Sequence, residues 1–388
     1  DPNGKILRRS LYSRLRFHFQ FRNEYALFTG TNDHGRMVFG VSVYGTHLSQ
    51  ARFLHMSNLF SPTTIDASFE HGGNGICGGI KNADDQWNTD GHRNRIIEVN
   101  EATLELFARL YDAPGTPAME ARLPSLHSRE LVEVLRKFAD YPKRLGDLEG
   151  QYVSTEMWHE TNAVVDGTIR RATQFPSSTK EWILSGPHIH IGNPLFKTPR
   201  SVCTANGHYD PLDLTILPAD YLPRTNYVPA CDPQTYLSRT PRVPWGEQKP
   251  VTEFYRFVAR RQLSQAGERT LLFAIEPPAV GHIDSCFSIT FQNSMHLLSL
   301  AGMCSSLPVD FFLKTTGKSD LRGDTARLLP LAEDNRLLII RQLILNCLTK
   351  YFADLWHECW EDEFVKQRWT KSDPRLDNSR FTSLTPQW

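Results

Sequence analysis

The stretch that decides the fold reads FYRFVARRQLSQAGERTLLFAIEPP and runs from Phe254 to Pro278. It contains two short apolar runs, 254–258 and 270–275. Runs of this length that are this apolar are typical of strands buried in a sheet. The stretch therefore predicts two strands, each apolar enough to be central.

Helices and loops are predicted on both sides of these strands. Apolar residues recur at helical spacing over 293–306 and over 335–354, which predicts two helices. Residues 314–323 between them are polar and basic and predict a flexible loop. Upstream, the segment Gly186 to Ile191 predicts a strand that enters a proline-rich loop between about 193 and 250.

The first part of the chain predicts a smaller segment. Alternating apolar residues over 15–21 and 37–44, joined by a Gly/Asn/Asp-rich turn at 29–35, predict an antiparallel pair of strands. Residues 60–95 are rich in Gly, Asn, Asp and Ser and predict a loop.

Two helices are predicted next, over about 100–113 and 127–140, the second with Ser128 as its N-cap. Pro142 and the glycines that follow it indicate a boundary. We therefore expect an α+β chain: a mixed-sheet domain with helical extensions, preceded by a smaller segment of β-hairpin plus helices. The expected domains are residues 1–150 and 151–388.

The charge composition weakens a nucleic-acid interpretation without removing it. The 388 residues include 43 Lys and Arg and 43 Asp and Glu, so the net charge is zero. Phosphate contacts supply much of the affinity of DNA-binding proteins, but only the local surface has to be positive. The opening segment has such an excess, which indicates either a binding face or a solvated basic face: Lys5, Arg8, Arg9, Arg14, Arg16 and Arg22.

Other features concern the compartment and the ends of the chain. No run of about 18 apolar residues occurs, so no membrane span is expected. The 7 cysteines are scattered, odd in number and without a Cys-x-x-Cys pair, which predicts a reduced protein in the cytoplasm. The chain starts at Asp1, and Ser383 to Trp388 carry packing side chains, so we expect it to be part of a longer polypeptide.

The run Asn193 to Phe196 is comparable with the Asn-Pro-Pro-aromatic motif by which amino-methyltransferases hold a flipped adenine. Such an enzyme also needs a glycine-rich turn between a strand and a helix for S-adenosylmethionine. The glycines from Gly72 to Gly79 follow no apolar strand and open no predicted helix. We therefore expect Asn193 in a turn, with no catalytic residue and no cofactor in this chain.

Metal and hydrolase chemistry is also not expected. His188 and His190 alternate on a predicted strand but have no third ligand nearby in sequence, so a hydrogen-bonding role is favoured over zinc. His159 and His357, each followed by Glu, lack the second His of a zinc-binding helix motif. No carboxylate cluster with the spacing of a nuclease occurs.

Basic and aromatic residues are mixed in the proline-rich loop. Arg and Asn side chains can form paired hydrogen bonds with guanine and adenine edges, and Lys mainly holds phosphates. An ordinary surface with local salt bridges would have the same composition, so both interpretations stay open. The residues concerned are Lys197, Arg200, Arg224, Arg239, Arg242 and Lys249 with Phe196, Tyr209, Tyr221 and Tyr227.

Several blocks resemble the region beyond the catalytic motifs of large N6-adenine DNA methyltransferases, found in type IIG restriction-modification enzymes and in BREX and DISARM phage defence. Leu15 to Glu24 resembles their FQFxNE stretch, and 254–278 resembles the YR…ERTL…PP signature of their target-recognition region, its Glu-Arg-Thr-Leu part being the most specific. Residues 297–318 are similar to the block that follows, with Cys304-Ser305-Ser306 in place of Leu-Asn-Ser. The tail, 369–388, resembles the segment before the final helical region.

The resemblance implies a sequence-specific DNA recognition module. The family's catalytic motif and cofactor turn lie upstream of the part represented here, so S-adenosylmethionine would serve the parent enzyme and the chain alone would be inactive. The implied partners are double-stranded DNA and the missing methyltransferase domain, with other phage-defence proteins as further candidates. The alternative is a protein–protein interaction module of a phage-defence complex.

The resemblance and the basic loops together name the expected DNA-binding residues. Phosphate holders are expected at Lys197, Arg200, Arg260, Arg261, Lys314, Lys318 and Arg322. Base readers are expected among Arg224, Asn226, Arg239 and Arg242. Arg269 has two open roles, a DNA contact or an internal ion pair with Glu268.

Overall fold

The structure is a computed structural model. It describes residues 4–28, 37–190, 195, 197–264, 267–332 and 335–387. Helices make up 33% and strands 21%, with parallel and antiparallel pairs in mixed sheets. The expected α+β class is confirmed. Asn193 and the turn at 29–35 lie outside the described residues.

The chain folds into two compact units, which we describe separately. Unit 1 comprises residues 1–142 together with the short segments 265–268 and 311–317. Unit 2 comprises 143–264, 269–310 and 318–388. Each unit is therefore built from more than one stretch of sequence.

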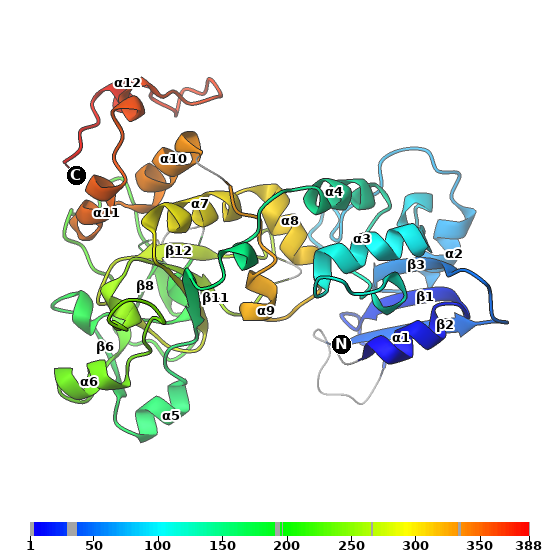
Figure 1. Ribbon diagram of the computed structural model, residues 1–388, viewed down its shortest axis with the longest axis horizontal. Helices are drawn as coiled ribbons and strands as arrows, with labels where there is room; N and C mark the ends of the chain where they lie inside the picture. The colour runs from blue at the N-terminus through cyan, green and yellow to red at the C-terminus, as the bar shows by residue number, and fades with distance from the viewer. Residues whose placement is uncertain are drawn as a thin grey trace. The chain divides into compact units, whose positions relative to one another are not determined.

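Unit 1 contains a four-stranded sheet in the order β2-β1-β3-β4 (Figure 1). Its first two strands pair antiparallel, with Phe19 opposite Val41, so the predicted strand pair is confirmed. β3 adds in parallel to β1, and β4 pairs antiparallel with β3. The strands are β1 (Leu15–Arg22), β2 (Val38–Tyr44), β3 (Arg52–Leu59) and β4 (Ile97–Asn100).

The helices of unit 1 are in part those predicted. The region predicted as a loop at 60–95 contains a helix, α2, because Ile65 packs against the core residues Met56 and Leu59. The predicted Ser128 cap is wrong: the N-cap residue of α4 is Arg129, without a side-chain cap, and the Ser128 backbone carbonyl accepts from the Leu131 amide. The helices are α1 (Lys5–Leu11), α2 (Thr63–Glu70), α3 (Glu101–Tyr111) and α4 (Glu130–Ala139), with short 3-10 turns at Arg93–Arg95 and Ala118–Glu120.

Unit 2 contains two four-stranded sheets, β12-β11-β14-β5 and β13-β7-β10-β6, and a two-stranded sheet, β8-β9. The strands predicted from the 254–278 stretch are β11 and β12, which pair antiparallel with Phe257 opposite Ile275. β12 lies at the edge of its sheet instead of the centre, although all four of its residues are buried. The strands are β5 (Tyr152–Thr155), β6 (Ile169–Gln174), β7 (Ile183–Leu184), β8 (Lys197–Pro199), β9 (Tyr209–Pro211), β10 (Thr225–Pro229), β11 (Arg256–Arg260), β12 (Phe273–Glu276), β13 (Gly281–His282) and β14 (Cys286–Phe291).

Helix α7 (Ser294–Cys304) confirms one prediction and lies along the β12-β11-β14-β5 sheet (Figure 1). The helix predicted over 335–354 is interrupted: α10 ends at Asn346, and a 3-10 turn precedes α11. The strand predicted at Gly186 is wrong, because Pro187 starts a 3-10 helix, Gly186–His188. The remaining helices are α5 (Glu160–Val165), α6 (Pro233–Arg239), α8 (Leu307–Thr315), α9 (Gly323–Ala326), α10 (Arg336–Asn346), α11 (Ala353–Glu358) and α12 (Ser379–Thr382), with 3-10 turns at Leu145–Leu148, Thr179–Glu181, Val251–Glu253, Lys350–Phe352 and Asp362–Lys366.

Candidate nucleic-acid interface

Arg261 is enclosed by carboxylates. Its guanidinium lies 3.3 Å from both Glu156 and Asp284 and 3.6 Å from Asp320. Arg322 donates to the same Glu156 at 2.8 Å. Of these two arginines, both expected to hold phosphates, Arg261 is largely buried among carboxylates, whereas Arg322 pairs with Glu156 and stays 55% exposed.

Most of the other predicted contacts also have partners inside their own unit. The Lys318 ammonium pairs with Asp324 at 3.4 Å, and the Lys314 ammonium donates to the Gly267 carbonyl at 3.2 Å. Arg239 donates to the Thr168 hydroxyl at 2.7 Å and lies 3.4 Å from the Asp166 carboxylate. Arg242 donates to the Gln248 carbonyl at 2.9 Å. These bonds orient each side chain within the protein.

Asn226, expected among the base readers, is buried in unit 2. Its amide nitrogen donates to the Tyr209 hydroxyl at 2.8 Å, and its amide oxygen accepts from the Thr173 hydroxyl at 3.0 Å. Only 5% of its surface is exposed. In this conformation Asn226 positions the loop before β9 against β6 and presents no group to a duplex.

Four cations lie on or directly beside β6, β8 and β10, and we call them the β8 cluster: Arg171, Lys197, Arg200 and Arg224. Arg224 is fixed by its backbone amide, which donates to the Thr198 hydroxyl at 3.0 Å. Its guanidinium donates to the Pro199 carbonyl at 3.4 Å and lies 4.3 Å from the Phe175 ring centroid. Arg224 directly precedes β10, and these contacts hold its side chain beside β8.

Arg171 joins the β8 cluster from the edge strand β6. The two-residue alternation of a strand puts Arg171 and Thr173 on one face, the face that contacts the loop before β9. There the Arg171 guanidinium donates to the Cys203 carbonyl at 2.8 Å and lies 5.9 Å from the Tyr227 ring centroid. Arg171 remains exposed in spite of these contacts.

The β8 cluster has little negative charge to balance it. Arg200 pairs with Asp210 at 2.8 Å, and both side chains are 53% exposed. An exposed pair of this kind is worth about 1 kcal/mol or less, so a phosphate can compete for the arginine. Arg171, Lys197 and Arg224 form no ion pair with any residue that the structure describes. The cluster therefore offers positive charge to an anionic partner.

Arg260 is a further cation without a carboxylate partner. It ends β11, and its guanidinium makes neither a hydrogen bond nor an ion pair with the described part of the chain. Partial burial lowers the pKa of Arg260, against the opposing effects of Cys286 and Tyr209. A half-buried guanidinium of this kind gains from an anion that replaces lost hydration.

The Glu-Arg-Thr-Leu block serves internal structure. Arg269 donates to the Cys304 carbonyl, at the end of α7, at 3.1 Å and lies 3.4 Å from Asp310. The Asp310 carboxylate accepts from the Thr270 amide at 2.9 Å and from the Leu271 amide at 2.7 Å. The internal ion pair of Arg269 is thus with Asp310, and the ion pair expected with Glu268 does not form.

An arginine and a glutamate are buried on neighbouring strands inside unit 2. Arg256 on β11 stands opposite Glu276 on β12, and neither side chain is exposed. Burial raises the pKa of Glu276, with the Arg256 charge opposing it, and burial lowers the pKa of Arg256 to about 10. Both carboxylate oxygens of Glu276 lack a hydrogen-bond donor. Since solvent does not reach this pair, it is no part of a DNA-binding surface.

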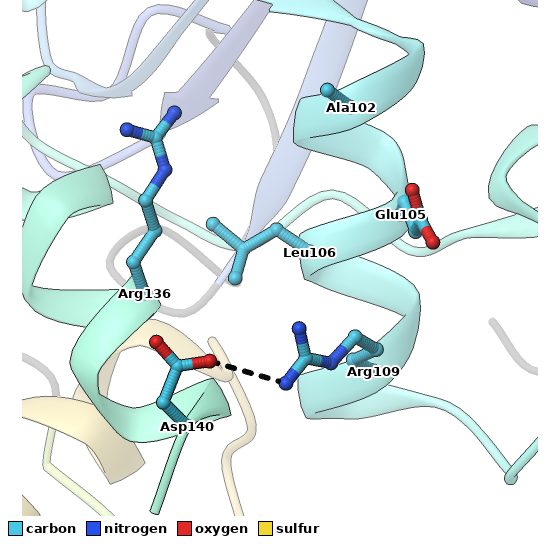
Figure 2. A pocket seen from close by; sticks show the side chains of 6 residues that line it. All are labelled: Ala102, Glu105, Leu106, Arg109, Arg136 and Asp140. Atoms are coloured by element: carbon cyan, nitrogen blue, oxygen red, sulfur yellow. Dashed lines mark hydrogen bonds and ion pairs between the residues drawn. The ribbon is translucent and has the colours of Figure 1, made fainter.

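A hollow of about 260 Å³ lies between α3 and α4 of unit 1 (Figure 2). Arg109 spans it and donates to the Asp140 carboxylate at 3.3 Å and to the Ala139 carbonyl at 2.8 Å. Arg136, from the facing helix, pairs with Glu133 at 2.6 Å on its own helix. The hollow is therefore a polar groove closed by internal ion pairs, and it brings no catalytic group together.

The described residues contain no group of three or more His, Cys, Asp and Glu side chains arranged for a metal ion. His188 is buried, and its imidazole contacts Ser185 and the Arg224 carbonyl. No single described helix is long and apolar enough to cross a membrane, and one bent pair, α7 with α8, passes on length and composition.

The sequence reasoning missed Arg171. The run Thr168 to Gln174 alternates polar and apolar side chains only weakly, so the sequence set no bounds for a strand there. Without those bounds, nothing indicated that Arg171 would contact the loop that follows β8. The doubled Arg170-Arg171 was the available signal.

No protein-family model and no curated protein matches the sequence.

Proposed function

We propose that this chain is the DNA recognition module of an S-adenosylmethionine-dependent adenine-N6 methyltransferase that serves restriction-modification or phage defence in the cytoplasm. The methyl group would come from S-adenosylmethionine bound by a catalytic domain outside this chain. The module itself would hold double-stranded DNA and select the site. The motif resemblance suggests this role, and the β8 cluster supports it.

The single observation that carries the proposal is the surplus of unpaired positive charge around β8. Of the four cations on or beside β6, β8 and β10, only Arg200 has a carboxylate partner among the described residues, the exposed Asp210. Arg171 and Arg224 also lie against aromatic rings, which limits their motion and orients their guanidinium planes. Oriented guanidinium groups suit phosphate oxygens and guanine edges. The remaining predicted contacts, above all Arg261 and Arg322, would shape the module from within.

Duplex binding by the 388-residue chain tests the proposal. Fluorescence anisotropy with a labelled duplex of mixed sequence, at about 50 mM salt, should show saturable binding. Lys197→Glu and Arg171→Ala should each weaken it by about fivefold or more, the equivalent of about 1 kcal/mol. Lys197 suits this purpose because its side chain has no ion pair to disrupt among the described residues.

The matched control is Lys371→Glu, which makes the same change of net charge at an exposed lysine of the C-terminal segment. It should leave the affinity within about twofold of the original. If the chain binds no duplex at low salt, the proposal fails. If Lys371→Glu and Lys197→Glu weaken binding equally, the β8 cluster is not the interface.

A further inference from the structure

Strand β2 forms an open edge of the unit 1 sheet. It is the last strand in the order β2-β1-β3-β4, and its only pairing is with β1. Within the described ranges, no backbone group hydrogen-bonds to its outer side. Natural proteins usually protect such an edge with a lysine, a proline or a covering element. The seven residues VFGVSVY contain neither a charge nor a proline.

The side chains along this edge are apolar and exposed. Val38, Val41, Val43 and Tyr44 are 47%, 47%, 45% and 48% exposed. Val41 and Val43 share a face with Phe39, which stacks on Phe21 at 5.1 Å. The apolar face of the sheet therefore continues to its open edge and ends there unpaired.

The sequence of β2 is complementary to itself in the antiparallel direction. With a two-fold axis at Val41, Val41 meets its own copy, Phe39 meets Val43, Gly40 meets Ser42 and Val38 meets Tyr44. Each pair joins side chains of similar character, and no charge meets a like charge. Of the two-fold axes that pass through a residue, only this one pairs all seven residues of the strand with one another.

From this we infer that β2 pairs with β2 of a second copy of the chain, joining two unit 1 sheets into one. In every pair the two residue numbers are both even or both odd. Backbone amides alternate between the two sides along a strand, so both residues of a pair point their amides the same way, either toward the second copy or away from it. Outward amides of one copy therefore meet outward carbonyls of the other. A two-fold arrangement of this kind closes on itself and does not propagate into fibres. This inference is independent of the proposed function.

Sedimentation equilibrium over a micromolar concentration series tests the pairing with the full chain. The unsubstituted chain should show a monomer–dimer equilibrium. Val41→Lys places two ammonium groups directly opposite each other across the axis, which destabilises an antiparallel pair, so the dimerisation constant should weaken at least about tenfold. The control is Val165→Lys, the same exchange at a side chain that is 83% exposed at the end of α5, and it should leave the equilibrium unchanged.

Disulfide trapping identifies the axis. Under mild oxidation Val41→Cys should yield a covalent dimer, because each new thiol faces its own copy within disulfide reach. Val38→Cys should yield much less, because its partner position is Tyr44. The original chain, with its partly exposed Cys77 and Cys231, gives the background. A chain that stays monomeric throughout, a dimer insensitive to Val41→Lys, or equal trapping at both positions would overturn the inference.

Discussion

Two adjacent arginines show how a single position decides a residue's role. Arg260 is the last residue of β11, and Arg261 directly follows the strand. Arg261 meets three carboxylates, whereas Arg260 has no ion pair within the described chain. The sequence contains the pair of arginines but not the placement of Glu156, Asp284 and Asp320. Both were therefore expected to hold phosphates, and only Arg260 is free of internal carboxylates.

His282 is a buried residue whose protonation state is fixed by its neighbours. Its Nδ1 lies 3.1 Å from the Ile283 carbonyl, so Nδ1 carries the proton, and Nε2 accepts from the Ser288 hydroxyl at 2.8 Å. Burial first, and then the Arg256 charge, lowers the pKa of His282 to about 3. The folded protein therefore keeps this imidazole neutral where an unfolded chain would protonate it.

Acid should accordingly destabilise unit 2. The pKa of an unfolded histidine is about 6.5, so stability is fully present above that pH and is lost as pH falls from about 6.5 toward 3. At pH 5 the loss attributable to His282 is about 2 kcal/mol. Urea unfolding between pH 5 and 6 should show a shallower dependence on pH for His282→Gln, by about one proton. His357→Gln, at an exposed histidine, is the control, and an unchanged slope for His282→Gln would contradict the assignment.

At the scale of elements, the stretch 254–278 and the segment 297–318 meet in one contact. Asp310, in the first turn of α8, holds the backbone amides that lead into β12. Arg269 bridges that carboxylate to the carbonyl end of α7. The contact satisfies helix-end and loop groups that would otherwise be buried without partners. Its role is to fix where β12 begins.

Removing the Asp310 carboxylate should therefore unfold this junction. Asp310→Ala leaves two backbone amides without their acceptor and the Arg269 guanidinium without its counter-charge, with an expected loss of about 3 kcal/mol. Asp310→Asn keeps one acceptor oxygen and should lose less. Chemical denaturation provides the measurement, with Asp220→Ala, in an exposed pair with Lys350, as the control. Equal losses for Asp310→Ala and Asp220→Ala would show that the contact is peripheral.

Elements with strong local signals were predictable from the sequence. The alternation in β1 and β2 and the apolar stripe of α3 reflect burial on one face, which a sequence shows directly. Helix α2 was missed because its two fully buried residues, Thr64 and Ser68, are polar, and Ile65 packs against the core while only partly buried. The 3-10 turn at Pro187 was predicted as a strand, because an apolar run this short shows no clear hydrophobic periodicity.

The candidate site was less predictable because its members come from separate strands. Lys197 and Arg224 were named from composition, yet so was Asn226, whose burial depends on contacts with Tyr209 and Thr173. The sequence shows which residues are cations, but whether a carboxylate lies beside a given cation depends on the tertiary structure. The cations without a carboxylate partner can therefore be identified only in the folded unit.

At the scale of the whole molecule, segments of the two units alternate along the sequence. The segment 311–317 belongs to unit 1, although it follows most of unit 2 in sequence. Within unit 1, Phe312 stacks on Tyr111 at 5.7 Å and on Phe138 at 5.0 Å. The Thr315 carbonyl also accepts from the Ser125 amide at 3.0 Å. Unit 1 is thus completed by residues far from its own sequence.

This connectivity predicts which part of the molecule each core substitution should loosen. Phe312→Ala removes a ring that is 1% exposed, and such a change costs about 3–5 kcal/mol. Hydrogen exchange should therefore speed up in α3 and α4, with β11 and β14 retaining their protection. Phe257→Ala, at a fully buried ring that stacks on Phe273 at 4.6 Å, should give the reverse pattern. If both substitutions accelerate exchange equally in all four elements, the two units unfold as one cooperative block and the division has no energetic meaning.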